Sequence, residues 1–471
     1  MGGVVGQRLL GVMFGVVATL LAVSLLVISL ALGLGLGIGK QGCDCEPYPS
    51  LAECPEEEVV QYVNVGVLHS LSGAMASSER PIVDATLLAI NEINAAGGLN
   101  GTLLRPIIRD GGSDEEIFAA EATDLLQTEG VAVIFGCWSS PSRKAVLPVL
   151  EESDGLLFYP AHYEGLESHP DVVYTGGIPN QQVLPAVRWA ATEQGWRSFA
   201  LVGADGIYSR AVHAIIKDEL TANGIDPTNI TEHFLFVSDN SIADITTMVG
   251  EIVNTTQPDV ILHTITGKTN ANFFSILQAE QPEDDPIPVV SFSTSESDIP
   301  IIGLGSFVGT YLSRNYFQSL NISASHAFVS SFKQQYGSIS VTGDQQAAAY
   351  TAVYLWSEAA RAAASSAKAD VLAALTSPSF SLLSPKQTAP LRVDAGNQHV
   401  FNTWYVGAVQ DGEENVRIDE RGTATIEPEP FPNGVKSVEE WKQFLECWKE
   451  KWNGSWQNRD TSSAPLPGDT C

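Results

Sequence analysis

Short apolar runs recur along the chain between residues 63 and 292, and polar turns bound each of them. The runs are rich in β-branched residues, which is typical of strands buried on both faces of a parallel sheet. They cover residues 63–68, 131–135, 155–159, 199–203, 259–264 and 288–292. We therefore predict a strand at each run.

Helical patterns fill the intervals between these predicted strands. Residues 81–96 show the clearest one, since Ile82, Ala85 and Leu88 recur at helical spacing and Gly97 marks the end. The predicted helices cover residues 81–96, 115–127, 142–152, 183–192, 211–222 and 244–254. Strand–helix alternation predicts doubly wound α/β layers. About 300 residues of it exceed a single core, so we expect two α/β lobes.

An uncharged apolar segment precedes this region, from Leu9 to Gly39, and Arg8 and Lys40 flank it. A helix of about 20 apolar residues crosses a bilayer, whereas a cleaved signal has an apolar core of about 7 to 15. We expect a transmembrane signal-anchor with the body exported; the glycine-rich end leaves a cleaved signal as the alternative. Five glycosylation sequons fit an exported glycoprotein, with coincidence as the alternative; they lie at Asn100, Asn229, Asn254, Asn321 and Asn453.

The amino-acid composition limits the classes of partner that the chain can bind. The chain has 25 Lys and Arg against 55 Asp and Glu, a net charge of −30. Nucleic acids are excluded because phosphate binding needs clustered cations, and the acidic body is unsuited to anionic lipid. The 44% hydrophobic content supplies a large core and excludes general disorder.

Cysteines gather near the two ends of the sequence. They are Cys43, Cys45, Cys54, Cys137, Cys447 and Cys471. This distribution predicts disulfides that hold the termini of an exported domain, with Cys137 as a buried small residue. An odd cysteine then remains, which could link two chains. A zinc site is the alternative, although no histidine lies near the first cluster.

A polar or glycine-containing turn follows each predicted strand. The turns cover residues 69–73, 136–140, 159–165, 203–206, 264–267 and 293–296. In parallel α/β sheets ligands bind beyond the carboxyl ends of the strands, so two facing lobes would form a cleft that closes on a solute. The turns hold hydroxyls, aromatic rings and few cations, which suits a small neutral polar ligand. We expect Arg143 and Lys144 to be surface or lobe-stabilising residues.

Several segments resemble one family specifically. They are GVLHSLSG at 66–73, FGCWSS at 135–140, SRKAVLP at 142–148, LFYP at 157–160, YEGLE at 163–167, YTG at 174–176, PNQQ at 179–182 and NYFQS at 315–319. Together they resemble the urea and short-chain amide binding branch of the type I periplasmic binding proteins, over residues 62–410. The resemblance implies a two-lobed Venus-flytrap fold, three hinge crossings and a ligand between the lobes.

The resemblance also implies which residues contact the ligand. They are Ser139, Ser140, Tyr159, Pro160, Ala161 and Tyr163 in the first lobe, and Asp205, Tyr208, Thr294, Ser295 and Glu296 in the second. Urea offers four N–H donors and one carbonyl, so hydroxyls and carboxylates should surround it. Gly206 and Ala161 depart from the family pattern by removing an aromatic ring and a polar group, which either enlarges the pocket or leaves it more hydrated.

Simpler roles exist for the same residues. Ser139 and Ser140 could cap the helix that starts near Pro141. Tyr159 could pack in the core, and Asp205 could be the N-cap of the helix after it.

We expect no enzyme. Ser139 with His162 lacks the G-x-S-x-G elbow of hydrolases, and no lysine lies in the turns that hold Cys137 and Glu164. No phosphate-binding or dinucleotide fingerprint follows a predicted strand, and the histidines show no metal spacing. We therefore expect no cofactor and no metal.

The C-terminal tail lies outside the resemblance. Prolines at 428, 430 and 432 predict a non-helical connection. After them an amphipathic helix is predicted from the spacing of Trp441, Phe444, Leu445, Trp448 and Trp452. Its apolar face either packs on a lobe or forms a surface for a partner or a membrane.

The sequence thus predicts a membrane-tethered, extracytoplasmic solute-binding protein that closes on urea or a short amide for delivery to an ABC-type permease. A sensor ectodomain with a signalling partner is the first alternative, and a secreted amide hydrolase is the second. A stable homodimer would favour the sensor role. The predicted boundaries are 1–8 for the N-terminal flank, 9–39 for the anchor, 40–61 for a linker, 62–178 for lobe 1, 179–310 for lobe 2, 311–410 for the return to lobe 1 and 411–471 for the tail.

Overall fold

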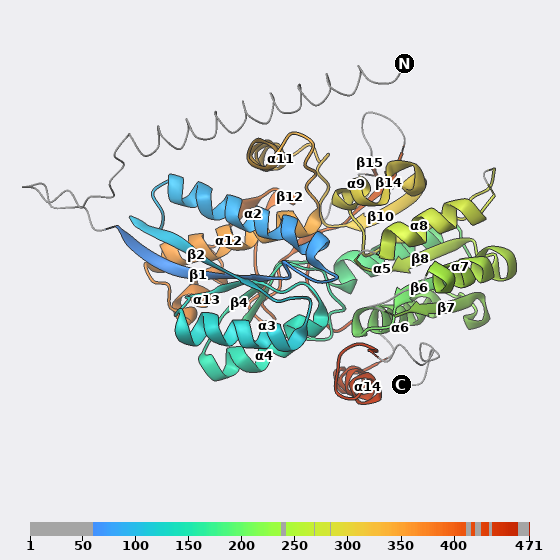
Figure 1. Ribbon diagram of the computed structural model, residues 1–471, viewed down its shortest axis with the longest axis horizontal. Coiled ribbons are helices and arrows are strands. Elements are labelled where there is room, and N and C mark those ends of the chain that lie inside the picture. Colours follow the sequence, from blue (N-terminus) through green and yellow to red (C-terminus); the bar gives the residue numbers. More distant parts are fainter. Residues whose placement is uncertain are drawn as a thin grey trace, which may run out of the picture. The chain divides into compact units, whose positions relative to one another are not determined.

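The computed structural model describes residues 60–236, 242–267, 269–282, 284–410, 416–419, 425–432, 436–459 and 471 (Figure 1). Residues from Val60 onward form one compact unit. The predicted membrane segment 9–39 and the cysteines at 43, 45 and 54 lie outside the described residues. Within the described part, no helix combines the length and the apolar character needed to cross a membrane.

A parallel five-stranded sheet forms the first lobe. Its order is β2-β1-β3-β4-β5, and every neighbouring pair is parallel. The strands are β1 (Gln61–His69), β2 (Thr102–Asp110), β3 (Ile134–Gly136), β4 (Leu157–Tyr159) and β5 (Val172–Tyr174). The runs predicted at 63–68, 131–135 and 155–159 are confirmed as β1, β3 and β4, with shorter bounds for the last two.

Helices cover both faces of this sheet because successive side chains of a strand point to opposite faces. Val65, Val67 and Phe135 face one core and Leu68 and Ile134 face the other. The first core is covered by α2 (Ala76–Ala95), α12 (Asp344–Ala363) and α13 (Lys368–Leu375), and the second by α3 (Glu115–Thr123) and α4 (Ser140–Ser153) (Figure 1).

A seven-stranded sheet forms the second lobe, in the order β15-β14-β10-β9-β8-β6-β7. Its strands are β6 (Phe199–Ala204), β7 (Ile230–Leu235), β8 (Val260–Thr264), β9 (Val289–Ser291), β10 (Thr310–Arg314), β14 (Tyr405–Val409) and β15 (Val416–Asp419). β14 is antiparallel to both of its neighbours, and the other pairs are parallel. The runs predicted at 199–203, 259–264 and 288–292 are confirmed as β6, β8 and β9.

The helices of the second lobe also form two layers. One core lies under α5 (Pro179–Thr192) and α6 (Ile207–Ala222). The opposite core lies under α7 (Ile242–Glu251), α8 (Thr269–Glu280), α9 (Ile299–Ile302), α10 (Leu304–Phe307) and α11 (Ser323–Tyr336). All six helices predicted from periodicity are present, and those at 115–127 and 244–254 end in π-helical turns, Asp124–Thr128 and Ile252–Thr256.

The chain passes between the two lobes three times: after β5, between β10 and α12, and before β14. The two-lobed fold with three crossings, implied by the resemblance, is thus confirmed. The short pairs β11 (Leu382–Ser384) with β12 (Gln387–Leu391), and β13 (Asn402–Thr403) with β16 (Thr425–Ile426), accompany the last crossing. The predicted lobe boundaries stay a prediction. β10 and β14 lie almost wholly in the segment 311–410, which was predicted to return to lobe 1, and they pair within the sheet of the second lobe.

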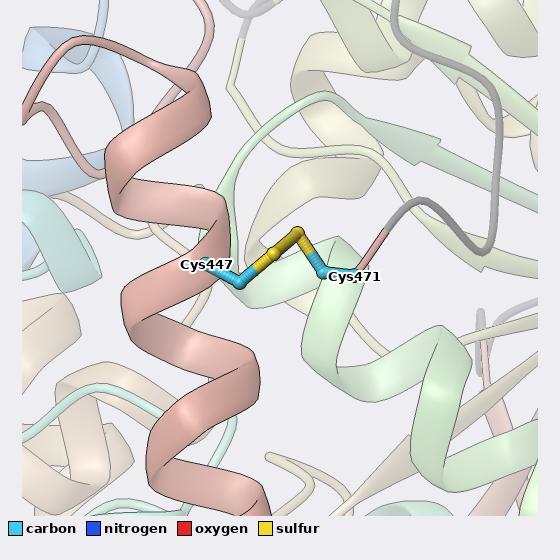
Figure 2. The surroundings of a disulfide bond; sticks show 2 residues. All are labelled: Cys447 and Cys471. Carbon is cyan, nitrogen blue, oxygen red and sulfur yellow. A yellow bond between two sulfur atoms is a disulfide. The ribbon is translucent and has the colours of Figure 1, made fainter.

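The predicted tail helix is α14 (Val438–Lys451), which packs on α6 of the second lobe (Figure 1). Ser437 caps it, and Glu440 completes a capping box. Of the two alternatives for its apolar face, the structure shows packing on a lobe. Figure 2 shows the disulfide between Cys447 of α14 and Cys471. One predicted disulfide among the end cysteines is therefore present, and it lies within the tail.

Candidate functional site

A cavity of ≈ 130 Å³ lies between the carboxyl ends of the strands of the two sheets. The first lobe contributes the turns after β1, β2, β3 and β4, and the second lobe contributes the turns after β6 and β8. The lining residues are Ser70, Ala74, Met75, Ser113, Asp114, Glu115, Trp138, Ser139, Ser140, Pro141, Ser142, His162, Ala204, Gly206, Ile207, Tyr208, Ser209, Thr266, Gln457 and Arg459. This is the place at which parallel α/β sheets bind ligands.

Ser139 and Ser140 line this cavity at the start of α4. Ser139 is the N-cap, since its hydroxyl oxygen accepts from the Ser142 backbone N–H at 3.2 Å. Ser140 is buried, and its hydroxyl donates to a carboxylate oxygen of Glu164. The serine cap predicted from sequence is confirmed for Ser139. Both residues line the cavity, and their contact with a ligand stays a prediction.

The predicted first-lobe residues Tyr159, Pro160, Ala161 and Tyr163 are buried behind the cavity wall and are not among its lining residues. The Tyr159 hydroxyl donates to the Trp138 carbonyl oxygen at 2.6 Å. The structure therefore supports the simpler role for Tyr159, packing that holds the turn after β3. The predicted contact of these four residues with a solute stays a prediction.

His162 takes the wall position instead. Its Nδ1 accepts from Gln345 Nε2 at 3.0 Å and lies 3.5 Å from Arg314 Nη1. Both partners are donors, so the imidazole proton is on Nε2. Burial, together with the Arg314 charge, holds the pKa of His162 well below its usual range. The His162 ring is therefore neutral at pH 7. The Tyr208 ring contacts it edge-on, with 5.4 Å between the two ring centroids.

A buried ion-pair network holds Ser140 from behind. Arg143 is fully buried and contacts Glu164 Oε1 at 2.9 Å and Glu167 Oε1 at 2.8 Å. Lys144 lies 3.0 Å from the other oxygen of Glu167. Burial opposes ionisation of Glu167, but the charges of Arg143 and Lys144 lower its pKa. Arg143 thus stabilises the lobe and is not a surface residue. It also holds the Glu164 carboxylate, which accepts the hydrogen bond from the Ser140 hydroxyl.

In the second lobe, Tyr208 lines the cavity and its hydroxyl donates to the Phe292 carbonyl oxygen at 3.2 Å. Asp205 does not line it, because its side chain is fully buried and pairs with Arg210 at 2.7 Å. The N-cap of α6 is Gly206, with no side-chain cap, so the alternative role of Asp205 as an N-cap is wrong. Asp205 orders the β6–α6 turn through Arg210.

The predicted contacts Thr294, Ser295 and Glu296 lie away from this cavity. Ser295 caps a short 3₁₀ turn with Asp298, and the Thr294 hydroxyl donates to Ser291 Oγ at 2.6 Å. Glu296 accepts from the Gln318 backbone N–H, and burial raises its pKa to about 7. Each of these side chains is hydrogen-bonded to another residue of the second lobe, and their contact with a solute stays a prediction.

Several lining residues were missed by the sequence reasoning. Ser113, Asp114 and Glu115 follow β2, which was not predicted because Arg105 and Pro106 interrupt its apolar pattern. The polar turn after residues 102–110 was the signal that could have found them. Gln457 and Arg459 come from the tail, where the sequence offered no comparable signal.

Acidic side chains outnumber positively charged ones among the described residues that line the cavity. Asp114 and Glu115 supply two carboxylates, and Arg459 supplies one guanidinium among the described lining residues. Arg459 Nη2 lies 3.1 Å from Glu115 Oε1, and Nη1 lies 3.9 Å from Asp114. Burial raises the pKa of Glu115, and the Arg459 charge counters part of this rise. The Arg459 guanidinium is therefore already paired with an acidic side chain of the same wall.

Among the described residues, no group of three or more His, Cys, Asp or Glu side chains is arranged to hold a metal ion. Cys137 is a free, fully buried thiol, and burial raises its pKa far above the usual value. It is thus the buried small residue predicted from sequence, since a thiol of this kind is not ionised at neutral pH.

A periplasmic binding protein domain model matches residues 63–437. A Rhodopseudomonas palustris solute-binding protein of an ABC transporter, solved with p-hydroxybenzoic acid, has the same fold with a TM-score of 0.69 and 19% identity, covering 78% of this chain and 98% of that one. A leucine binding protein from Thermotoga maritima gives a TM-score of 0.64 at 17% identity, over 76% of this chain and 97% of that one.

A third likeness is a branched-chain amino acid transporter substrate binding protein from Streptococcus pneumoniae, in complex with isoleucine. Its TM-score is 0.63 at 16% identity, over 76% of this chain and 99% of that one. These three likenesses show the shared two-lobed fold, and the domain model covers most of the sequence. The chain belongs to the periplasmic binding protein domain family.

Proposed function

We propose that this protein is an extracytoplasmic solute-binding protein that closes its lobes on urea or a short-chain amide and delivers it to an ABC-type permease. The observation that carries the proposal is the cavity between the two sheets, whose wall is rich in hydroxyls and has no unengaged cation among the described residues. The uncharged segment 9–39 would hold the protein at a membrane.

The polar groups of the wall suit a neutral solute with both N–H and carbonyl groups. Most of the wall hydroxyls already donate to protein acceptors, so toward a solute their oxygens act as acceptors, and the neutral His162 ring adds an N–H donor. The hydroxyls belong to Ser70, Ser113, Ser139, Ser140, Ser142, Ser209 and Thr266. An amide bound there can pair its polar atoms, and each buried donor left unpaired would cost about 1–3 kcal/mol.

A carboxylate solute fits this wall less well. The solved relatives named above were crystallised with an aromatic acid or an amino acid, or are named for one. Here an anion would meet Asp114 and Glu115, while the Arg459 guanidinium is paired with Glu115. Like charges at short range disfavour binding. Aromatic acids and amino acids are therefore the competing ligands that an experiment must include.

Hydrolysis is not favoured by the geometry. Ser140 donates to Glu164, and Ser139 caps α4, so both hydroxyls are held in structural bonds. The His162 nitrogen that could accept a proton is bonded to Gln345. A general base must lie within hydrogen-bond reach of its nucleophile and be free to accept the proton.

The test is calorimetry on the full chain with urea, formamide, acetamide, 4-hydroxybenzoate and leucine. We expect saturable binding of at least one of the first three solutes. Ser140→Ala and Tyr208→Ala should each weaken it, whereas Ser338→Ala, at an exposed serine outside the cavity, should not. Binding of only the carboxylates would refute the amide assignment, and release of ammonia from acetamide would support the hydrolase.

A further inference from the structure

The C-terminal tail is anchored to the second lobe beside the cavity. Trp441, Leu445, Trp448 and Trp452 form one apolar cluster with α6 residues such as Ile215. All four tail side chains are almost fully buried. The family match ends at residue 437, so this cluster is an addition to the shared domain.

After α14 the chain reverses and runs along the β6–α6 turn. Asn453 and Gly454 have positive φ values of 55° and 87°, which allow the reversal. The Ile207 backbone N–H then donates to the Trp456 carbonyl oxygen at 3.1 Å, and the Asn458 N–H donates to the Asp205 carbonyl oxygen at 3.0 Å. Gln457 lies between these two bonds and lines the cavity.

The same segment reaches the first lobe. Arg459 Nη2 lies 3.1 Å from Glu115 Oε1, and the Ser455 hydroxyl donates to the same oxygen at 3.3 Å. The Lys144 ammonium lies 4.4 Å from the centre of the Trp456 ring. Residues 454–459 therefore contact both lobes and form one side of the cavity.

Glu115 is left with one oxygen available. Ser455 and Arg459 both bind Oε1, whereas Oε2 is buried and has no hydrogen-bond partner among the described residues. A carboxylate oxygen only accepts hydrogen bonds, so a buried one favours an N–H or O–H donor. Glu115 is one of the residues that line the cavity, and we take a bound solute as the source of that donor.

We infer that tail residues 454–459 determine which solute binds: Arg459 and Ser455 position Glu115 so that its free oxygen accepts an N–H of the solute. The inference rests on the proposed function, because it concerns the same cavity. An amide supplies the N–H, whereas the carboxylate of equal size has none and is repelled by Glu115. Arg459 is a positioning residue in this arrangement, and Glu115 discriminates between solutes.

The test compares acetamide with acetate by calorimetry on the full chain. We expect Glu115→Gln to reduce the acetamide-to-acetate affinity ratio at least about tenfold, because a charged acceptor is lost and the repulsion of acetate is removed. Arg459→Gln should lower the ratio as well, and Arg459→Lys should restore most of it. Arg188→Gln, which breaks an exposed pair with Glu219, should leave the ratio unchanged.

Hydrogen exchange of peptides covering residues 453–459 and 205–210 shows whether the tail stays docked in each variant. An unchanged ratio in Glu115→Gln, with acetamide still bound, would overturn the inference and leave the proposed function standing. If the wild type binds acetate as tightly as acetamide, the inference fails as well. If the wild type binds none of the amides although its tail is protected, both the proposed function and the inference fail.

Discussion

Trp448→Ala should release the tail while leaving the second lobe folded. Trp448 is 2% exposed, its ring stacks on Trp452 at 5.1 Å, and the Arg210 guanidinium lies 4.2 Å from its centre. Truncation of a buried Trp costs about 3–5 kcal/mol. Because α14 packs on the outside of α6, most of this loss should appear as weaker docking of the tail.

Native-state hydrogen exchange measures this loss. The Asn458 amide is bonded to the Asp205 carbonyl and reports docking, whereas Val202 lies inside β6 and reports global unfolding. A loss of 3 kcal/mol should speed exchange at Asn458 by roughly 100-fold, with little change at Val202. Glu446→Ala, at an exposed site of the same helix, is the control. Equal acceleration at Asn458 and Val202 would refute a separately docked tail.

Three further predictions concern stability in guanidinium chloride. Burial raises the pKa of Glu296 in the folded state to about 7, against 4.5 for the free group, so the folded protein keeps the proton to a higher pH than the unfolded chain does. The free energy of unfolding should therefore fall by about 3 kcal/mol as the pH rises from about 4.5 to about 7. Glu296→Gln should remove that slope, and an unchanged pH profile would contradict the assignment. Gly136→Ala places a Cβ 2.1 Å from the Leu68 carbonyl oxygen, so the free energy of unfolding should fall by about 1–3 kcal/mol and the denaturation midpoint should drop. An unchanged midpoint would show that the strands tolerate the methyl group. Arg143→Met leaves the buried Glu164 carboxylate without its cation, whereas Glu167 keeps Lys144, and should cost about 3–5 kcal/mol. Arg188→Met at the exposed pair should cost about 0–1 kcal/mol; equal losses would argue against the buried network.

The strands that the sequence revealed and those that it hid differ in burial. β6 and β8 are buried along their whole length, and β6 and the first three residues of β8 read as continuous apolar runs. β7 is half-buried and carries Glu232 and His233 within it, so the run is interrupted. Lys217 on α6 forms an ion pair with that carboxylate and His213 lies beside it: burial opposes ionisation of Glu232, but the two partners lower its pKa to about 2. Polar residues that are paired across elements look like a loop in sequence.

The candidate site shows the same division. Ser139 and Ser140 were identifiable because they follow a strand and precede a helix, and both line the cavity. Tyr159 and Asp205 occupy equivalent turns, yet each side chain points to a buried partner, Trp138 or Arg210. Local sequence gives the turn but not the rotamer, which depends on neighbours that are distant in the chain.

The sequence alone determined the two α/β lobes, the ends of the strands at which the site lies, and the amphipathic helix of the tail. These features depend on local periodicity and on the rule that parallel strands share an edge. Only the tertiary structure decided that Gln457 and Arg459 complete the cavity and that Arg459 meets Glu115 across the lobes. The two residues of that ion pair are more than three hundred positions apart, so no local pattern relates them, and their contact exists only once α14 has packed on α6.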